Sequence, residues 1–150
     1  MTETQPMDAI TCRDIIREIF DRNRFVQVCG IVIDEVACGW ARLHMPIDGD
    51  VHVNPAGFVH GGAFSTLANT AIGVACCTVG ALTVTQSFNI NFMRNVKAGE
   101  TVTCEATVIN RGRHLIVLNS EIKNEAGKLL AEVLCTMYVT GEDTVIPQKW

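Results

Sequence analysis

A run of residues without a charged side chain, 63–79, constrains the fold of this chain more than any other feature. At about 1.5 Å of rise per residue, the run makes a helix roughly 25 Å long. Its length and its serine, threonine and asparagine residues argue against a membrane span. Because apolar residues occupy every side of the helix, we expect it to be buried inside the fold.

A turn-rich loop, residues 54–62, precedes this run and ends in the sequence His-Gly-Gly. The first turn of a helix has backbone N–H groups without intrahelical partners, and glycine lets another molecule approach the backbone closely. The N-terminus of a helix also favours negative charge. The loop and helix start are therefore suited to bind an anion or a developing oxyanion.

The composition is that of a globular protein, with 48% apolar and 19% charged residues, and we assign residues 1–150 to a single domain. The net charge of −4 argues against a nucleic-acid-binding protein, which would need a basic face. The first 14 residues are polar and acidic, without a basic start followed by an apolar stretch. No secretory signal is expected, and we predict a cytoplasmic protein that does not bind membranes.

Seven cysteines are present, and no two have the Cys-x-x-Cys spacing of zinc or redox sites. Five of them lie in segments patterned for burial, so we expect reduced thiols that pack as small apolar side chains. His44, His52 and His114 lack metal-ligand spacing as well. We therefore expect no metal ion and no other cofactor.

The spacing of apolar residues predicts further elements around the central helix. Residues 10–25 have helical spacing, with Thr11 or Asp8 as a cap, and residues 26–47 alternate as a hairpin that ends near Pro46. Four more strands are predicted at 84–92, 101–109, 114–123 and 129–139, whereas the tail after residue 139 has no clear pattern. Short turns favour antiparallel pairing. These elements predict an α+β fold in which an antiparallel six-stranded sheet wraps around the long central helix, with a short N-terminal helix.

The order of elements and several motifs resemble the hotdog-fold thioesterases, in particular the PaaI-like branch of acyl-CoA thioesterases. The resemblance covers about residues 25–140. It is carried by N-x-x-G-x-x-H-G-G at 54–62, L-A-x-x-A at 67–71, F-N-I-N-F-M-R at 88–94, and glycines at 99, 112 and 127.

This resemblance implies an acyl-CoA bound at the interface of a homo-oligomer, either a dimer joined through a strand into one sheet or a tetramer of such dimers. Asn54 would hydrogen-bond near the thioester carbonyl, the Gly61 N–H would polarise the carbonyl oxygen, and His60 would brace the loop. Thr85 would assist from the partner subunit. The residues expected to contact the acyl group or the phosphates of coenzyme A are Gly62, Phe88, Arg94, Arg111 and Arg113.

One position departs from the family pattern. Family members carry Asp or Glu on the buried helix two turns beyond His-Gly-Gly, where this chain has Asn69. A carboxylate takes a proton from water or attacks the carbonyl, whereas a neutral carboxamide only orients water. Asp48 and Asp50, in the preceding loop, are the acidic candidates to replace it. We predict an acyl-CoA thioesterase that is weakened by Asn69.

Two other functions stay open. A non-catalytic acyl-CoA-binding or sensing protein would not need the carboxylate. A hotdog dehydratase or hydratase would need a histidine paired with an acidic residue, and no such spacing is found. The selected residues also have structural interpretations: Asn54 as a turn residue, Asn69 as a buried amide, Thr85 as an ordinary strand residue, and the arginines as solvated charges.

Overall fold

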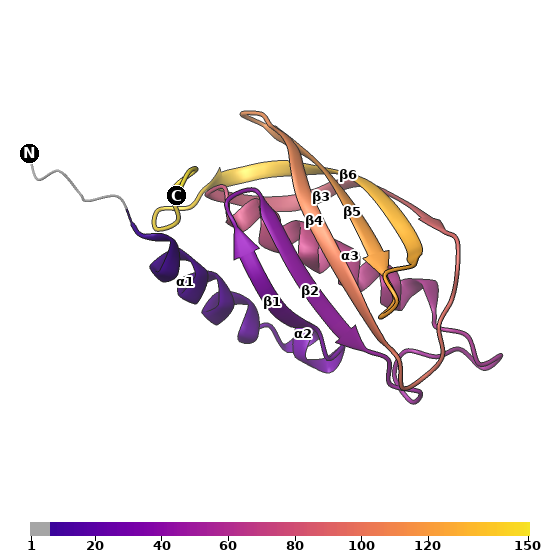
Figure 1. Cartoon of the computed structure of the whole chain (residues 1–150). Coiled ribbons are helices and arrows are strands. Elements are labelled where there is room, and N and C mark those ends of the chain that lie inside the picture. The colour runs from indigo at the N-terminus through magenta and orange to yellow at the C-terminus, as the bar shows by residue number, and fades with distance from the viewer. Residues whose placement is uncertain (1–6) are drawn as a thin grey trace, which may run out of the picture.

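The computed structural model describes residues 7–150 as one curved sheet around a central helix (Figure 1). Two helices, α1 (Ala9–Asp21) and α2 (Arg24–Val28), precede the hairpin of β1 (Val32–Ala37) and β2 (Trp40–Pro46). The central helix, α3 (Gly61–Cys77), comes next. It is followed by four strands, namely β3 (Ala81–Phe92), β4 (Thr101–Arg111), β5 (Leu115–Lys123) and β6 (Leu129–Glu142).

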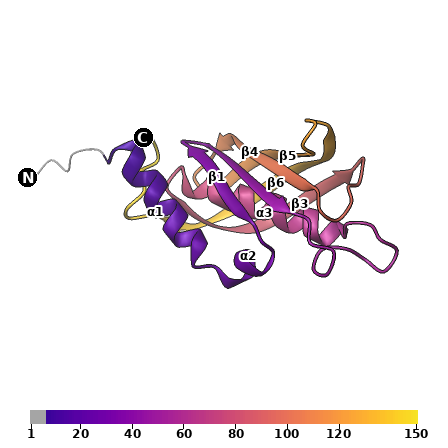
Figure 2. The same ribbon diagram turned by 60° about the horizontal axis from the view of Figure 1, so that its bottom comes forward.

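The sheet has the strand order β1-β2-β4-β5-β6-β3, and every neighbouring pair is antiparallel. It curves around α3, which crosses its concave face (Figures 1 and 2). Leu67, Ala71 and Ile72 of α3 are each fully buried, because the uncharged helix packs against β2, β3 and β4. The predicted α+β fold is confirmed.

Hydrogen bonds from side chains to the backbone shift several predicted boundaries at the N-terminus. The helix predicted at 10–25 is interrupted because the side chain of Asn23 accepts hydrogen bonds from the Phe25 and Val26 N–H groups and starts α2. Val26, predicted at the start of a strand, is therefore helical. At the start of α1, Asp8 is the cap, since it accepts the Thr11 N–H at 2.8 Å.

The tail without a sequence pattern packs against the end of α3. The Ile146 side chain is 1% exposed, and the Trp150 indole N–H donates to the Thr78 carbonyl at 2.7 Å. Thr78 is the C-cap of α3. The tail therefore covers the C-terminal end of the central helix.

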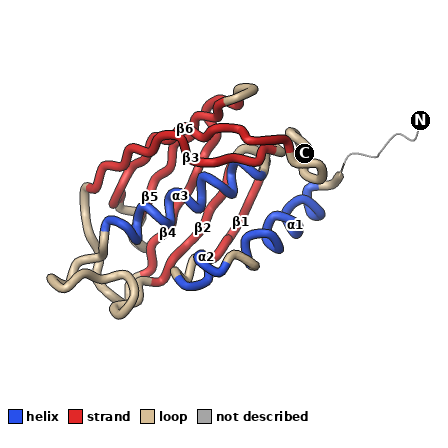
Figure 3. The backbone as a smooth tube through the Cα atoms, turned by 180° about the vertical axis from the view of Figure 1, so that it is seen from behind, coloured by secondary structure: helices blue, strands red, loops and turns tan. Residues whose placement is uncertain are grey.

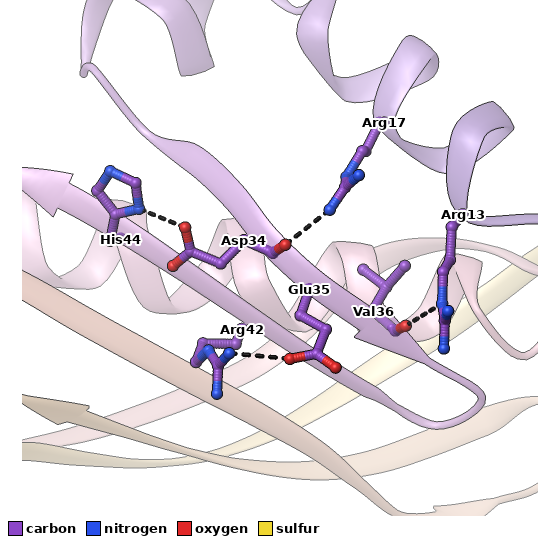
Figure 4. Close-up of polar contacts among 7 residues, drawn as sticks. All are labelled: Arg13, Arg17, Asp34, Glu35, Val36, Arg42 and His44. Atoms are coloured by element: carbon purple, nitrogen blue, oxygen red, sulfur yellow. Dashed lines mark hydrogen bonds and ion pairs between the residues drawn. The ribbon is translucent and has the colours of Figure 1, made fainter. Parts of the chain in front are cut away.

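The first strand of the sheet, β1, is covered by α1, and we call it the closed edge (Figure 4). Arg13 donates to the Val36 carbonyl at 3.0 Å, and Arg17 donates to the Asp34 carbonyl at 2.6 Å. These carbonyls would otherwise be unpaired at the edge of a sheet. Two arginines of the helix therefore take the place of another strand.

The last strand of the sheet, β3, forms the open edge. It is 12 residues long, contains no charged side chain, and pairs only with β6 among the described residues. Leu82 and Val84 are 49% and 54% exposed. A long, uncharged strand that is unpaired on one side is well suited to pair with another strand.

Candidate active site

The start of α3 presents one free backbone donor. His60 is the N-cap, and its Nδ1 accepts the Gly62 N–H at 3.3 Å. No acceptor for the Gly61 N–H is found among residues 7–150. His60 therefore braces the helix start, while the Gly61 N–H remains available for a ligand oxygen.

A side chain at position 61 would reach the ring of Phe92. A Cβ built on Gly61 would lie 3.1 Å from the tip of that ring, which is tighter than ordinary van der Waals contact. The Phe92 ring in turn stacks on Phe64, with 6.4 Å between ring centroids. The end of β3 and the start of α3 are therefore in direct contact, and glycine at position 61 permits this contact.

Asn54 shapes the loop that leads to this helix start. Its Oδ1 accepts hydrogen bonds from the Ala56 and Phe58 N–H groups, both at 3.0 Å. The side-chain oxygen thus holds the turn before His60, as the structural interpretation expected. The Nδ2 group is the part of Asn54 left to donate to a ligand.

Asn69 and Thr85 form the second polar feature of the site. The Asn69 Nδ2 donates to the Thr85 Oγ1 at 2.8 Å, which links α3 to the open edge. Thr85 thus lies beside Asn69 of its own chain, and its expected role at the site of the partner subunit stays a prediction. One of the two Nδ2 hydrogens is used in this bond, so Asn69 Oδ1, the second Nδ2 hydrogen and the Thr85 O–H are left to hold water.

These two residues line a groove of about 740 Å³. Most of its lining residues belong to α1, α2, α3 and β3, and Figure 3 shows where these elements lie. Of the predicted site residues, the groove brings together Asn69, Thr85 and Phe88, while Asn54, His60, Gly61 and Gly62 lie outside it. The other lining residues are Ile19, Phe20, Asn23, Phe25, Val26, Ser65, Thr66, Thr70, Gly73, Cys77, Ala81, Leu82, Thr83, Val84, Met137, Thr140 and Asp143.

No carboxylate within the described chain takes over the position of Asn69. Among residues 7–150, Asp143 is the only acidic residue that lines the groove, and its carboxylate accepts the Val145 and Ile146 N–H groups. Asp48 and Asp50 do not line the groove; the Asp48 carboxylate instead accepts the Asp50 N–H at 2.8 Å.

The one cysteine that lines the groove is a poor nucleophile. Burial raises the pKa of the Cys77 thiol to about 11, so the thiol stays protonated at neutral pH. Among the described residues the groove therefore has groups that can orient water, but no evident base and no activated thiol.

The three arginines expected to bind coenzyme A are distributed between both ends of β3. Arg94 follows the end of β3 that contacts Gly61, and it donates to the Leu129 carbonyl at 2.9 Å. Arg111 is at the other end, where it pairs with Glu142 at 2.6 Å, and Glu142 lies opposite Ala81. Arg113 is exposed in the neighbouring turn. Within one chain these guanidinium groups do not converge.

Two residues that hold the loop were not selected from the sequence. The Asn95 side chain accepts the Val59 N–H at 3.0 Å and donates to the Val59 carbonyl at 3.1 Å. His52 is 4% exposed, and both of its ring nitrogens are hydrogen-bonded. Neither residue has a spacing that would distinguish it, because its partners are remote in the sequence or belong to the backbone.

Other features limit the chemistry of the described residues. Residues 7–150 contain no group of three or more His, Cys, Asp or Glu side chains that could hold a metal ion. The same part of the chain has no helix that is long and apolar enough to cross a membrane. All seven cysteines have free thiols.

Comparison with known proteins identifies the family of this chain. The thioesterase superfamily matches residues 56–131. The acyl-coenzyme A thioesterase PaaI of Escherichia coli is 30% identical over 113 residues, which are 75% of this chain and 80% of that protein.

Solved structures extend the likeness to the fold. The structure of the E. coli PaaI protein from the phenylacetic acid degradation operon matches with a TM-score of 0.80 and 28% identity, covering 84% of this chain and 91% of that one. A variant of PaaI from Thermus thermophilus matches with a TM-score of 0.74 and 28% identity, covering 78% and 99%. The predicted hotdog fold and the PaaI-like resemblance are confirmed.

Proposed function

The chain belongs to the thioesterase superfamily, and we propose that it hydrolyses an acyl-CoA thioester to a free acid and coenzyme A. The observation that supports this most directly is the free Gly61 N–H at the start of a buried helix. A donor fixed at this position stabilises the negative charge that develops on a thioester carbonyl oxygen. The E. coli relative named as an acyl-CoA thioesterase supports the same reaction.

In the proposed reaction, the carbonyl oxygen accepts the Gly61 N–H, with Asn54 Nδ2 as a second donor. A water molecule held by Asn69 Oδ1 and the Thr85 hydroxyl attacks the carbonyl carbon. The C–S bond breaks, and the thiolate of coenzyme A takes up the proton that the water loses. Because Asn69 accepts no proton at neutral pH, positioning and oxyanion stabilisation supply the catalysis, and we expect turnover to be slow.

The proposed site needs two copies of the chain. Gly61 and Asn69 are eight residues apart on α3, which is about 12 Å along the helix axis. A water that attacks a carbonyl carbon must lie about 3–3.5 Å from that carbon. Gly61 of one copy therefore acts with Asn69 and Thr85 of the other.

The open edge offers a way to join the two copies. Antiparallel pairing of β3 with β3 of a second copy would continue the sheet. It would bring the end of β3 near Gly61 and Arg94 in one copy toward the end near Arg111 and Arg113 in the other. Guanidinium groups from both copies would then be available for the phosphates of coenzyme A. We propose a homodimer of this kind, with a tetramer of such dimers as the larger assembly.

The charge of the groove favours a neutral acyl group. Most of its lining side chains are apolar, hydroxyl or amide groups, and Asp143 is the single charged residue that the described part of the chain contributes. An acyl group with its own carboxylate would lose hydration without gaining a basic partner. The proposed substrates are therefore aliphatic or aromatic acyl-CoAs without a second acid group.

A second function is favoured by one specific observation. None of the described residues places a carboxylate beside Asn69, so a protein that binds acyl-CoA without hydrolysing it is also consistent with the site. For either function we propose a cytoplasmic location, because thiols stay reduced in a reducing compartment and all seven cysteines have free thiols.

Thiol release from a panel of neutral acyl-CoAs, followed with a chromogenic thiol reagent, tests the proposal. We expect release above the buffer rate, with a large loss in Gly61→Pro, which lacks the N–H. Gly61→Ala is the matched control, because it keeps the N–H but places the same Cβ 3.1 Å from the Phe92 ring, and it should lose much less activity. Acyl-CoA binding by calorimetry without thiol release would favour the non-catalytic function, and neither binding nor release would contradict both.

A further inference from the structure

His52 is a buried histidine outside the groove. Its Nδ1 accepts the Asp48 N–H at 2.9 Å, and its Nε2 faces the Cys29 carbonyl at 2.8 Å. A backbone N–H can only donate and a carbonyl can only accept. The ring is therefore neutral, with its proton on Nε2, and both of its nitrogens are used within the protein.

This ring joins two segments that are distant in the sequence. Cys29 is the C-cap of α2, while Asp48 lies just beyond β2, at the start of the loop. The backbone of His52 extends the link, because its carbonyl accepts the His60 N–H at 2.8 Å. A continuous series of hydrogen bonds thus runs from the end of α2 through His52 to the N-cap of the central helix.

The other side of the loop is held by Asn95, which bonds both backbone groups of Val59. His52 and Asn95 thus fix the two residues that precede Gly61, His60 through the His52 carbonyl and Val59 through the Asn95 amide. The loop between them is otherwise exposed at Pro55, Ala56 and Phe58. The position of the Gly61 N–H therefore depends on these two anchors.

We propose that His52 is a positioning residue for the oxyanion-binding N–H of Gly61, an inference that rests on the proposed thioester hydrolysis. The neutral ring holds residues 48–60 against α2, and this sets the direction from which the chain enters α3. An oxyanion donor acts mainly in the transition state. Loss of the ring bonds should therefore lower kcat much more than it changes KM.

The test compares His52→Leu, which removes both ring bonds, with His52→Gln, which keeps one side-chain donor and one acceptor. We expect kcat for a neutral acyl-CoA to fall about 10–100-fold in His52→Leu, since a misplacement of about 1 Å costs about 100-fold. KM should stay within about threefold, and His52→Gln should recover part of kcat. His114→Leu, at an exposed histidine in a turn, is the matched control and should keep the wild-type kcat.

A kcat for His52→Leu within twofold of the wild type, with or without a lower Tm, would overturn the proposal. If His52→Leu fails to fold, the protonation of the ring nitrogens in the wild-type protein is measured instead. Imidazole 15N spectra at neutral pH should show a ring protonated on Nε2 alone, and a charged ring or the other tautomer would overturn the proposal.

The backbone amide resonances of Gly61 and Gly62 separate this inference from the proposed function. If the wild-type protein hydrolyses no acyl-CoA, the proposed function fails, but these resonances still report the position of the helix start. They should shift in His52→Leu and remain in place in His114→Leu. Unchanged Gly61 and Gly62 resonances in a folded His52→Leu protein would overturn the positioning role of His52.

Discussion

The two edge strands of this sheet differ in length, in charge and in whether a helix covers them. The closed edge, β1, has 6 residues, includes Asp34 and Glu35, and is covered by α1 through Arg13 and Arg17 (Figure 4). The open edge, β3, has 12 residues, has no charge, and borders the groove with Asn69 and Thr85. Proteins prevent an edge strand from pairing with another chain by making the strand short, by placing charged side chains on it, or by covering it. The difference supports the proposal that β1 ends the sheet, whereas β3 pairs with a second copy that also completes the site.

The largest effect is expected from charges on the open edge. Ser87→Lys combined with Asn89→Lys places like charges where two copies of β3 would meet, and should convert the proposed homodimer to a monomer. Hydrolysis should fall about 100-fold or more, because each copy then lacks the oxyanion donor of the other. Analytical ultracentrifugation and thiol release measure the two effects.

Val32→Lys is the matched control, because Val32 is 47% exposed on the closed edge. It should leave both mass and rate unchanged. A double lysine variant that keeps the mass and rate of the wild type would show that β3 does not join the copies.

The next effect concerns the residue that faces the open edge. Asn69→Asp supplies a carboxylate beside Thr85, whose hydroxyl would then donate to it, and kcat should rise about 100-fold. Thr66→Asp, one turn earlier on the same wall of the groove, adds the same charge and should give no gain. An unchanged or lower rate in Asn69→Asp would mean that position 69 is not the place of the base.

A smaller effect should separate substrates in the groove beside the open edge. We expect kcat/KM for hexanoyl-CoA to exceed that for adipoyl-CoA, which adds a terminal carboxylate, by about tenfold or more, because that charge has no basic partner. Asp143→Asn removes the one acidic side chain of the lining and should narrow the ratio. Equal rates for the two substrates would show that the acyl group does not occupy this groove.

The smallest effect is expected at the closed edge. Arg17→Ala leaves the Asp34 carbonyl without its donor and should lower the free energy of unfolding by about 1–2 kcal/mol, measured by urea denaturation. Arg22→Ala removes an exposed pair with Glu18 and should change stability by less than about 0.5 kcal/mol. Equal effects of the two substitutions would show that α1 is not held to the sheet through Arg17.

The local sequence specifies the elements well where a single pattern decides them. The uncharged run at 63–79 became α3, and the alternating segments became strands, because periodicity is a property of adjacent residues. Predictions failed where one side chain redirected the backbone. Asn23 starts a second helix inside the predicted one, and the tail is held by Trp150 against the end of α3.

The candidate site divides in the same way. The position of Gly61 at a helix start can be read from the sequence alone, whereas a carboxylate in place of Asn69 is expected only from the resemblance to the family. The residues that contact Asn69 and the loop before Gly61 cannot be read from the sequence. Contact between Asn69 and Thr85 depends on how β3 returns along α3, and the His52 and Asn95 bonds depend on backbone groups that carry no sequence signal.

The sequence by itself therefore determined a hotdog-type sheet around a buried helix, and it led to the proposal of an oxyanion-binding helix start without a base. Only the tertiary structure decided which edge is closed by arginines, which edge is open, and what holds the loop before Gly61. The physical reason is the separation along the sequence of the residues that interact. Helix and strand patterns are set by neighbours a few residues apart, whereas these contacts join residues that only the folded chain brings together.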